Sequence, residues 1–128
     1  MGVKIAAALG HTVVAISTSA NKEKIALEKG AHHFVVSSDP ESIKAQAGKC
    51  DIILNTVSVP HDLNVYLQLL AKSGTLVQLG GVGAPHSVSQ FPLMMTRKSI
   101  AGSLIGGIRD TQEVIDLCHE HKIYPDCQ

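Results

Sequence analysis

The segment that decides the fold reads VVAISTSANK and spans residues 13–22. It begins as an apolar, β-branched run, which predicts a short strand buried on both faces. It then changes to small hydroxyl side chains and a lysine, just before a helical pattern begins at residues 23–29. In a doubly wound α/β sheet, ligands bind at the carboxyl ends of the strands, so this change is typical of a binding site.

The side chains at this strand end indicate which dinucleotide would bind there. An Asp or Glu accepts hydrogen bonds from a free ribose 2′-hydroxyl, whereas a 2′-phosphate is repelled by a carboxylate and needs donors and positive charge. The strand ends in Ser17, Thr18 and Ser19, with Lys22 close behind and no acid among them. A nucleotide site here would therefore favour NADP. Taken alone, the stretch suits an ordinary helix N-terminus with a solvated lysine about as well.

The composition is typical of one globular domain. The chain has 128 residues, of which 45% are hydrophobic and 17% charged, and its eleven basic and eleven acidic side chains cancel. This balance predicts no nucleic-acid surface. We find no bilayer-length apolar run and no secretory leader, so we expect a cytoplasmic protein without a membrane segment. The three cysteines lack a paired spacing, and a metal site around Cys118 and His121 is a weak alternative.

Apolar runs and helical patterns alternate along the whole chain. Strands are predicted at residues 11–17, 34–36, 51–57, 75–79 and 99–104. Helices are predicted at residues 1–9, 21–29, 39–48, 60–74 and 93–97, with a last helix that begins with a capping box of Asp110 and Glu113. Near-continuous apolar strands separated by amphipathic helices predict an α/β fold with a parallel sheet covered on both faces.

Four pieces of this pattern stand out together: residues 16–19 with Lys22, 51–57, 79–81 and 100–107. In this order and spacing they resemble the coenzyme-binding half of the zinc-dependent medium-chain alcohol dehydrogenases, in particular the cinnamyl-alcohol-dehydrogenase-like, NADP-dependent aldehyde reductases. The resemblance covers essentially all 128 residues. It implies a Rossmann-type, doubly wound parallel sheet and a single, partial dinucleotide-binding domain over residues 1–128.

The resemblance also implies NADP(H) as the cofactor and assigns contacts at four strand ends. The implied cofactor-binding residues are Ser17, Thr18, Ser19, Lys22, Thr56, Val57, Ser58, Leu79, Gly80, Gly81, Ser103, Leu104 and Ile105. Ser17, Thr18 and Lys22 would hold the 2′-phosphate, and residues 56–58 would lie along the adenosine ribose and the middle of the cofactor. Residues 79–81 would pass beside the nicotinamide ribose, and residues 103–105 would meet the carboxamide. Singly, each residue also suits an ordinary turn or strand; jointly, they favour a cofactor site.

In the family that this chain resembles, a hydride passes between nicotinamide and an alcohol or aldehyde carbon held on zinc. No zinc-ligand set and no catalytic residue is recognised here, so we expect zinc and the small-molecule substrate to be bound by a missing catalytic domain. The chain alone should be inactive. A homodimer through the last strand, near residues 99–108, is also implied. The alternatives are a non-catalytic nucleotide-binding or dimerisation module and a zinc-free quinone reductase of the same superfamily.

The family's first strand and its glycine-rich phosphate loop would lie before Met1, so we expect a truncated sheet. In the strand order 3-2-1-4-5-6 the first strand is central. Its loss would leave residues 12–17 and 51–57 facing a gap with unpaired backbone groups. We therefore expect the sheet to close up, to borrow a strand from a neighbouring molecule, or to be completed by upstream residues.

Overall fold

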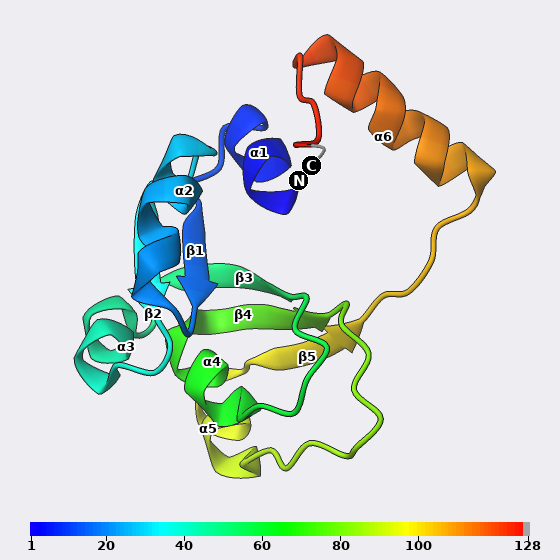
Figure 1. Cartoon of the computed structure of the whole chain (residues 1–128). Coiled ribbons are helices and arrows are strands. Elements are labelled where there is room, and N and C mark those ends of the chain that lie inside the picture. Colours follow the sequence, from blue (N-terminus) through cyan, green and yellow to red (C-terminus); the bar gives the residue numbers. More distant parts are fainter. Residues whose placement is uncertain (127–128) are drawn as a thin grey trace. The chain divides into compact units, whose positions relative to one another are not determined.

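The computed structural model describes residues 1–126, along which helices and strands alternate (Figure 1). The elements are α1 Gly2–Ala8, β1 Val14–Ser17, the 3-10 turn η1 Ala20–Lys22, α2 Glu23–Glu28, β2 His33–Val36, α3 Pro40–Gln46, β3 Cys50–Asn55, α4 Leu63–Leu69, β4 Leu70–Gln78, α5 Gln90–Thr96, β5 Ser99–Gly102 and α6 Ile108–Glu120. All the strand pairs are parallel. The predicted α/β class is confirmed. None of the described helices is long and apolar enough to cross a bilayer.

The strands form two sheets, one with the order β1-β2 and one with the order β3-β4-β5. Removing the first strand from the order 3-2-1-4-5-6 leaves the groups 3-2 and 4-5-6, and the two sheets correspond to these groups. The chain accordingly divides into two compact units. Unit 1 comprises Met1–Val36 and the chain from Ile105 onward, and unit 2 comprises Ser37–Leu104. Within the described residues the two sheets are separate, and the three outcomes expected for the missing strand stay predictions.

Unit 2 has an apolar core between its sheet and α4. Leu69, Leu70 and Leu76 are at most 1% exposed, and Ile53 on β3 is also buried. Within this unit α4 and α5 both pack against β4, as Figure 1 shows. The burial of α4 follows its sequence, because four of its seven residues are buried: Leu63, Tyr66, Leu67 and Leu69.

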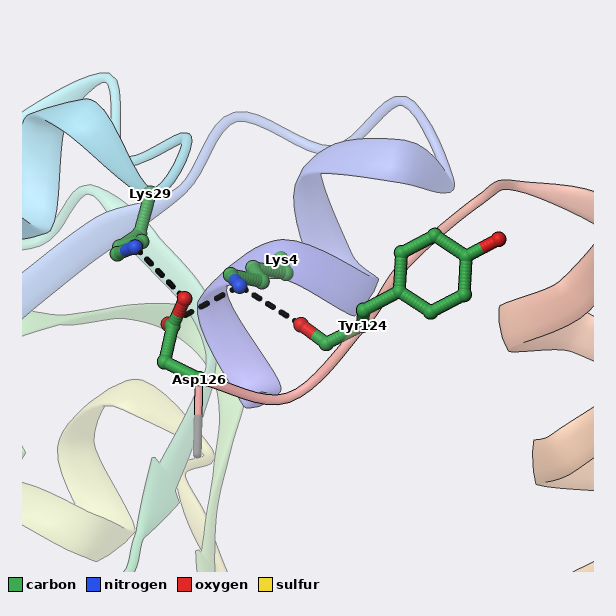
Figure 2. A network of polar contacts seen from close by, with 4 residues as sticks. All are labelled: Lys4, Lys29, Tyr124 and Asp126. Atoms are coloured by element: carbon green, nitrogen blue, oxygen red, sulfur yellow. Dashed lines mark hydrogen bonds and ion pairs between the residues drawn. The ribbon is translucent and has the colours of Figure 1, made fainter. Parts of the chain in front are cut away.

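Unit 1 has a smaller apolar core, to which β2 contributes Val35 at 0% exposure. Ala31 and Ile123 are the other buried apolar residues described in this unit. Figure 2 shows a polar contact between distant parts of the unit: the Asp126 carboxylate lies 3.0 Å from Lys4 Nζ and 2.9 Å from Lys29 Nζ. The segment after α6 is therefore joined to α1 and to the end of α2 within unit 1.

The helix predicted at residues 60–74 is much shorter in the structure. The Asp62 side chain accepts a hydrogen bond from the Asn64 N–H at 2.9 Å, so the helix begins at Leu63 and not at Pro60. It ends at Leu69, because Leu70 is already extended and pairs with Cys50. Gly74, predicted as the helix stop, lies inside β4, where a Cβ would come within 3.0 Å of the Asp51 carbonyl oxygen.

The predicted capping box of the last helix is wrong in one partner. The helix begins earlier than predicted, at Ile108, with Gly107 as its N-cap residue. Asp110 does accept a hydrogen bond from the Gly107 N–H, at 2.8 Å. Glu113 lies one turn further along and pairs instead with Arg109 at 2.9 Å. The early start places Asp110 at the third helical position, where an acid reaches back to the N-cap amide.

Candidate functional site

The carboxyl ends of β3, β4 and β5 form one edge of the sheet in unit 2. Asn55 pairs in register with Gln78, and Gln78 pairs with Gly102. Each strand stops there, so the predicted cofactor residues follow the strand ends instead of lying within them. This edge brings together the following predicted site residues: Thr56, Val57, Ser58, Leu79, Gly80, Gly81 and Ser103.

The turn after β4 lies directly against the turn after β3. The N–H groups of Leu79 and Gly80 both donate to the Asn55 carbonyl oxygen, at 2.9 and 3.0 Å. A Cβ added at Gly80 would come 2.7 Å from the carbonyl carbon of Thr56, so only glycine fits there. At Gly81 a Cβ would meet nothing within 4 Å. Gly80 thus permits the close backbone contact, and Gly81 leaves open space beside it.

Asn55 is a site residue that sequence reasoning missed. It is 4% exposed and is the buried polar residue of the described chain. Its Nδ2 donates to Gln78 Oε1 at 2.5 Å and lies 2.8 Å from His61 Nε2, while its Oδ1 accepts from the Val57 N–H at 3.2 Å. The sequence did contain a signal for Asn55, because it is a polar residue that ends an apolar strand and directly precedes the turn with Thr56 and Ser58.

The third strand end is tied to the second by one backbone bond. The Ser103 N–H donates to the Gln78 carbonyl oxygen at 3.1 Å, so Ser103 stays beside the end of β4. Beyond it Leu104 is 88% exposed and Ile105 is 90% exposed. Ser103 and Leu104 belong to unit 2, whereas Ile105 belongs to unit 1. Within unit 2 the structure therefore positions Ser103 firmly and leaves the Leu104 side chain outside the core.

The predicted phosphate-binding residues all lie in unit 1. Ser17 ends β1, and its Oγ accepts a hydrogen bond from the Ser19 N–H at 3.3 Å. This bond folds the hydroxyl residues into a tight turn that leads into η1, which Lys22 ends with an exposed side chain. Glu23 begins α2 directly afterwards. It is an acid that the sequence argument left out, and its carboxylate would oppose an anion bound at Lys22.

A pocket of about 510 Å³ lies behind the turn edge of unit 2 and is lined by the segments that follow β3 and β4. The His61 and His86 rings line it and meet edge to face, with centroids 5.0 Å apart. His86 Nδ1 lies 3.2 Å from the His61 carbonyl oxygen, so Nδ1 donates. His86 Nε2 is buried without a hydrogen-bond partner in the described structure. The imidazoles thus connect the segment after β3 with the segment after β4.

Among the described residues, no three or more His, Cys, Asp or Glu side chains gather closely enough to hold a metal ion. Cys50 is buried and Cys118 is half-buried, and both are free thiols. Burial, with a smaller effect from the Asp51 carboxylate, raises the pKa of the Cys50 thiol. Cys127 lies outside the described residues.

Comparison with known proteins gives a consistent result. The sequence pattern of one family, described as zinc-binding dehydrogenase, matches residues 1–120. A Bacillus subtilis protein named as a probable formaldehyde dehydrogenase is 47% identical over 125 residues, which are 98% of this chain and 36% of that protein. An NADP-dependent alcohol dehydrogenase of Mycolicibacterium smegmatis is 44% identical over 128 residues, which are all of this chain and 37% of that protein.

A solved structure of a cinnamyl alcohol dehydrogenase from Sorghum bicolor superimposes with a TM-score of 0.97 at 36% identity. The match covers all of this chain and 36% of the sorghum protein. The chain thus spans a little over a third of the length of these relatives.

Proposed function

Because the chain belongs to the zinc-binding dehydrogenase family, we propose that its 128 residues bind NADP(H) for an alcohol dehydrogenase or aldehyde reductase. The observation that carries the proposal is the carboxyl edge of β3, β4 and β5. There three turns meet, and the Gly80 backbone comes close to Thr56 where any side chain would collide. Carboxyl edges of parallel sheets are where such folds bind dinucleotides. The M. smegmatis relative is named as NADP-dependent.

The residues fit the cofactor in chemistry as well as in place. Ser17, Thr18 and Lys22 offer two hydroxyls and a positive charge, which suit a 2′-phosphate better than a free 2′-hydroxyl. In unit 2 the Gly81 position is open, and ligand atoms can approach the backbone there. We assign Leu79–Gly81 to the nicotinamide ribose and residues 103–105 to the carboxamide. Residues 56–58 take the adenosine ribose and the middle of the cofactor.

In the whole protein this chain would orient the nicotinamide for hydride transfer to or from an alcohol or aldehyde carbon. The hydride chemistry belongs to the cofactor, and the protein supplies position and electrostatics. We propose that residues 1–128 form one dinucleotide-binding domain and that the catalytic zinc and the substrate are held by other parts of the protein. A zinc-free quinone reductase would use the same fold, and zinc content of the whole protein separates the two. Its cytoplasmic location also stays a prediction.

We further propose a homodimer through β5. Among the described residues this strand pairs with β4 alone and forms the edge of its sheet. All four of its residues are exposed, and the next apolar side chains, Leu104 and Ile105, are almost fully exposed. An apolar edge of this kind is suited to pairing with a second copy. Light scattering should give twice the chain mass, and Ile100→Lys on β5 should return it to the monomer mass.

The cofactor proposal is tested by titrating the chain with NADPH and NADH and following nicotinamide fluorescence. NADPH should bind, and NADH should bind at least about ten-fold more weakly. Lys22→Ala should weaken NADPH about ten-fold and leave NADH unchanged, because only NADPH carries the 2′-phosphate. Lys24→Ala, on the exposed face of α2, is the matched control and should change neither ligand.

Tighter binding of NADH would overturn the phosphate assignment. Dimerisation with no affinity for either nucleotide would instead favour the non-catalytic dimerisation module.

A further inference from the structure

The hydrogen bonds of the Asn55 side chain leave it a single orientation. Its Oδ1 must accept from the Val57 N–H, since a backbone amide is only a donor. Nδ2 then faces two acceptors, Gln78 Oε1 and His61 Nε2, one for each of its hydrogens. Every polar atom of the buried carboxamide has a partner, which is the condition under which a buried polar network orders its surroundings.

The same bonds fix the protonation of His61. Because Nδ2 of Asn55 can only donate, His61 Nε2 must be the unprotonated nitrogen. The proton is therefore on Nδ1, which lies 2.6 Å from the Val59 carbonyl oxygen and donates to it. The imidazole thus ties the end of the turn after β3 back to the strand end, and its ring packs edge to face on Tyr66 at 5.5 Å.

Both turns of the cofactor edge depend on this one residue. The side chain of Asn55 holds Val57, while its backbone oxygen holds Leu79 and Gly80. Through Gln78 the network also reaches the strand position whose carbonyl binds Ser103. All three strand ends at the proposed site are therefore connected to Asn55 by hydrogen bonds, either directly or through Gln78.

We infer that Asn55 is a positioning residue for NADP(H), with His61 as the group that locks its carboxamide. It does not touch the cofactor; it sets the spacing between Val57 and Gly80, between which the ribose and pyrophosphate part of the cofactor would pass. This inference rests on the proposed function. It predicts that the network controls the affinity for the whole dinucleotide and has little influence on the 2′-phosphate end, which is held by Ser17 and Lys22.

The test compares NADPH with 2′,5′-ADP, which carries the 2′-phosphate and lacks the nicotinamide half. Asn55→Leu removes every side-chain hydrogen bond and keeps the branched shape, and His61→Phe removes only the hydrogen bonds of the imidazole. Each should weaken NADPH about ten-fold and 2′,5′-ADP by less than about three-fold. The loss for 2′,5′-ADP is smaller because it meets residues 56–58 through its adenosine ribose and lacks the half of the cofactor that lies beside Gly80. Leu63→Ala, in the core of unit 2, is the control. It should lower the stability of the fold and leave both dissociation constants of the folded chain unchanged.

The conservative variant Asn55→Asp gives a signature that a purely structural role would not produce. A carboxylate can still accept from the Val57 N–H, but it can bind His61 Nε2 only when that nitrogen is protonated. Asn55→Asp should therefore retain NADPH affinity within about three-fold, with His61 Nε2 now the donor to the carboxylate. Nitrogen-15 NMR of the imidazole distinguishes the ring expected in the parent chain, whose Nε2 carries no proton, from a ring of the variant whose Nε2 is protonated.

The outcomes distinguish the positioning role of Asn55 from the proposed binding of NADP(H) by the chain. Equal NADPH affinity in Asn55→Leu and the parent chain would overturn the positioning role and leave the proposed function intact. Equal losses of NADPH and 2′,5′-ADP would show that Asn55 serves folding alone, which also overturns it. If Asn55→Leu does not fold, His61→Phe and the NMR signature of Asn55→Asp still decide the question. Failure of the parent chain to bind NADPH would overturn the proposed function and this inference with it.

Discussion

Unit 1 and unit 2 are held together by different kinds of interaction. In unit 2, fully buried leucines on α4 and β4 form an apolar core, and each polar atom of the buried Asn55 carboxamide has a partner. In unit 1, the described apolar core is small, and distant segments are joined by ion pairs of Lys4 and Lys29 with Asp126 (Figure 2). The Asp126 side chain is 56% exposed, so these pairs lie in contact with solvent.

The two kinds of interaction differ in energy. Burying a leucine side chain contributes about 1.5–3 kcal/mol, whereas exposed ion pairs typically contribute little. We therefore expect unit 2 to be the more rigid part and unit 1 the part that opens first. The proposed ribose contacts lie on the rigid unit and the proposed phosphate contacts on the weaker one. A ligand that engages both sets should stabilise unit 1 by mass action.

The largest effect is expected from Leu76→Ala in the centre of β4. Leu76 is 0% exposed, so the truncation leaves a cavity and should lower the free energy of unfolding by about 2–5 kcal/mol. Leu54→Ala, on the neighbouring strand at 55% exposure, is the matched control and should cost under about 1 kcal/mol. Urea titrations followed by circular dichroism measure both. Similar losses in the two variants would contradict a buried core centred on β4.

The next effect separates the two glycines after β4. Gly80→Ala forces a Cβ against the Thr56 backbone, so the turns must move apart, and we expect a loss of about 1–3 kcal/mol. Gly81→Ala meets open space and should change stability by less than about 0.5 kcal/mol. The same urea titrations apply. Equal tolerance at both positions would mean that the two turns are not in backbone contact.

The sequence predicted the alternation of elements because that information is local. The run at residues 13–17 and the run at 51–55 are apolar and β-branched, and each is followed by a turn and a helix signal. Asp39 illustrates this: an acid before Pro40 predicted a helix start, and its carboxylate accepts from the Glu41 N–H at 3.1 Å. Placing hydroxyl and glycine residues at strand ends needed only the strand assignments.

The features that the sequence did not predict depend on tertiary contacts. Gly74 has the sequence context of a helix stop, but its requirement for glycine comes from the backbone of β3. Asn55 resembles an ordinary strand residue until Gln78, 23 residues later, and His61, in the segment after the strand, come within hydrogen-bond distance. Local pattern cannot reveal such partners. The sequence could therefore propose cofactor contacts at the strand ends, but it could not single out Asn55, whose proposed role depends on those partners.

The difference in burial between unit 2 and unit 1 should also give their thiols different reactivities. The pKa of Cys50, which is buried in unit 2, is raised by burial and then by Asp51, whereas Cys118 lies half-buried on α6 of unit 1. Because the thiolate is the reactive form, Cys50 should react with a disulfide reagent at pH 8 about ten-fold more slowly than Cys118. The measurement uses Cys127→Ser to leave two thiols, with peptide mass mapping to assign each. Faster labelling of Cys50 would indicate that unit 2 opens more readily than unit 1.

The smallest effect is expected at the ion pairs of unit 1. Hydrogen bonds from Lys29 and then Lys4 lower the pKa of Asp126, so its charged form is favoured in the folded chain. A lowered folded-state pKa contributes stability above the unfolded-state value, near 3.9, and this contribution is lost as the pH falls through the folded-state value. Asp126→Asn should therefore lower the Tm by at most about 2 °C at pH 7 and have no effect near pH 2.

The size of that shift tests the comparison between the units. Glu120→Gln, a charge removal on the exposed face of α6 without a described ion pair, is the control and should leave the pH dependence unchanged. Salt at 1 M should reduce the effect of Asp126→Asn, since the screening length then falls to about 3 Å, close to the separation of these charges. A large, salt-independent loss would mean that these pairs are shielded from solvent in the folded chain. Unit 1 would then be held as firmly as unit 2, and the turn proposed to bind the 2′-phosphate would be preformed before the cofactor binds.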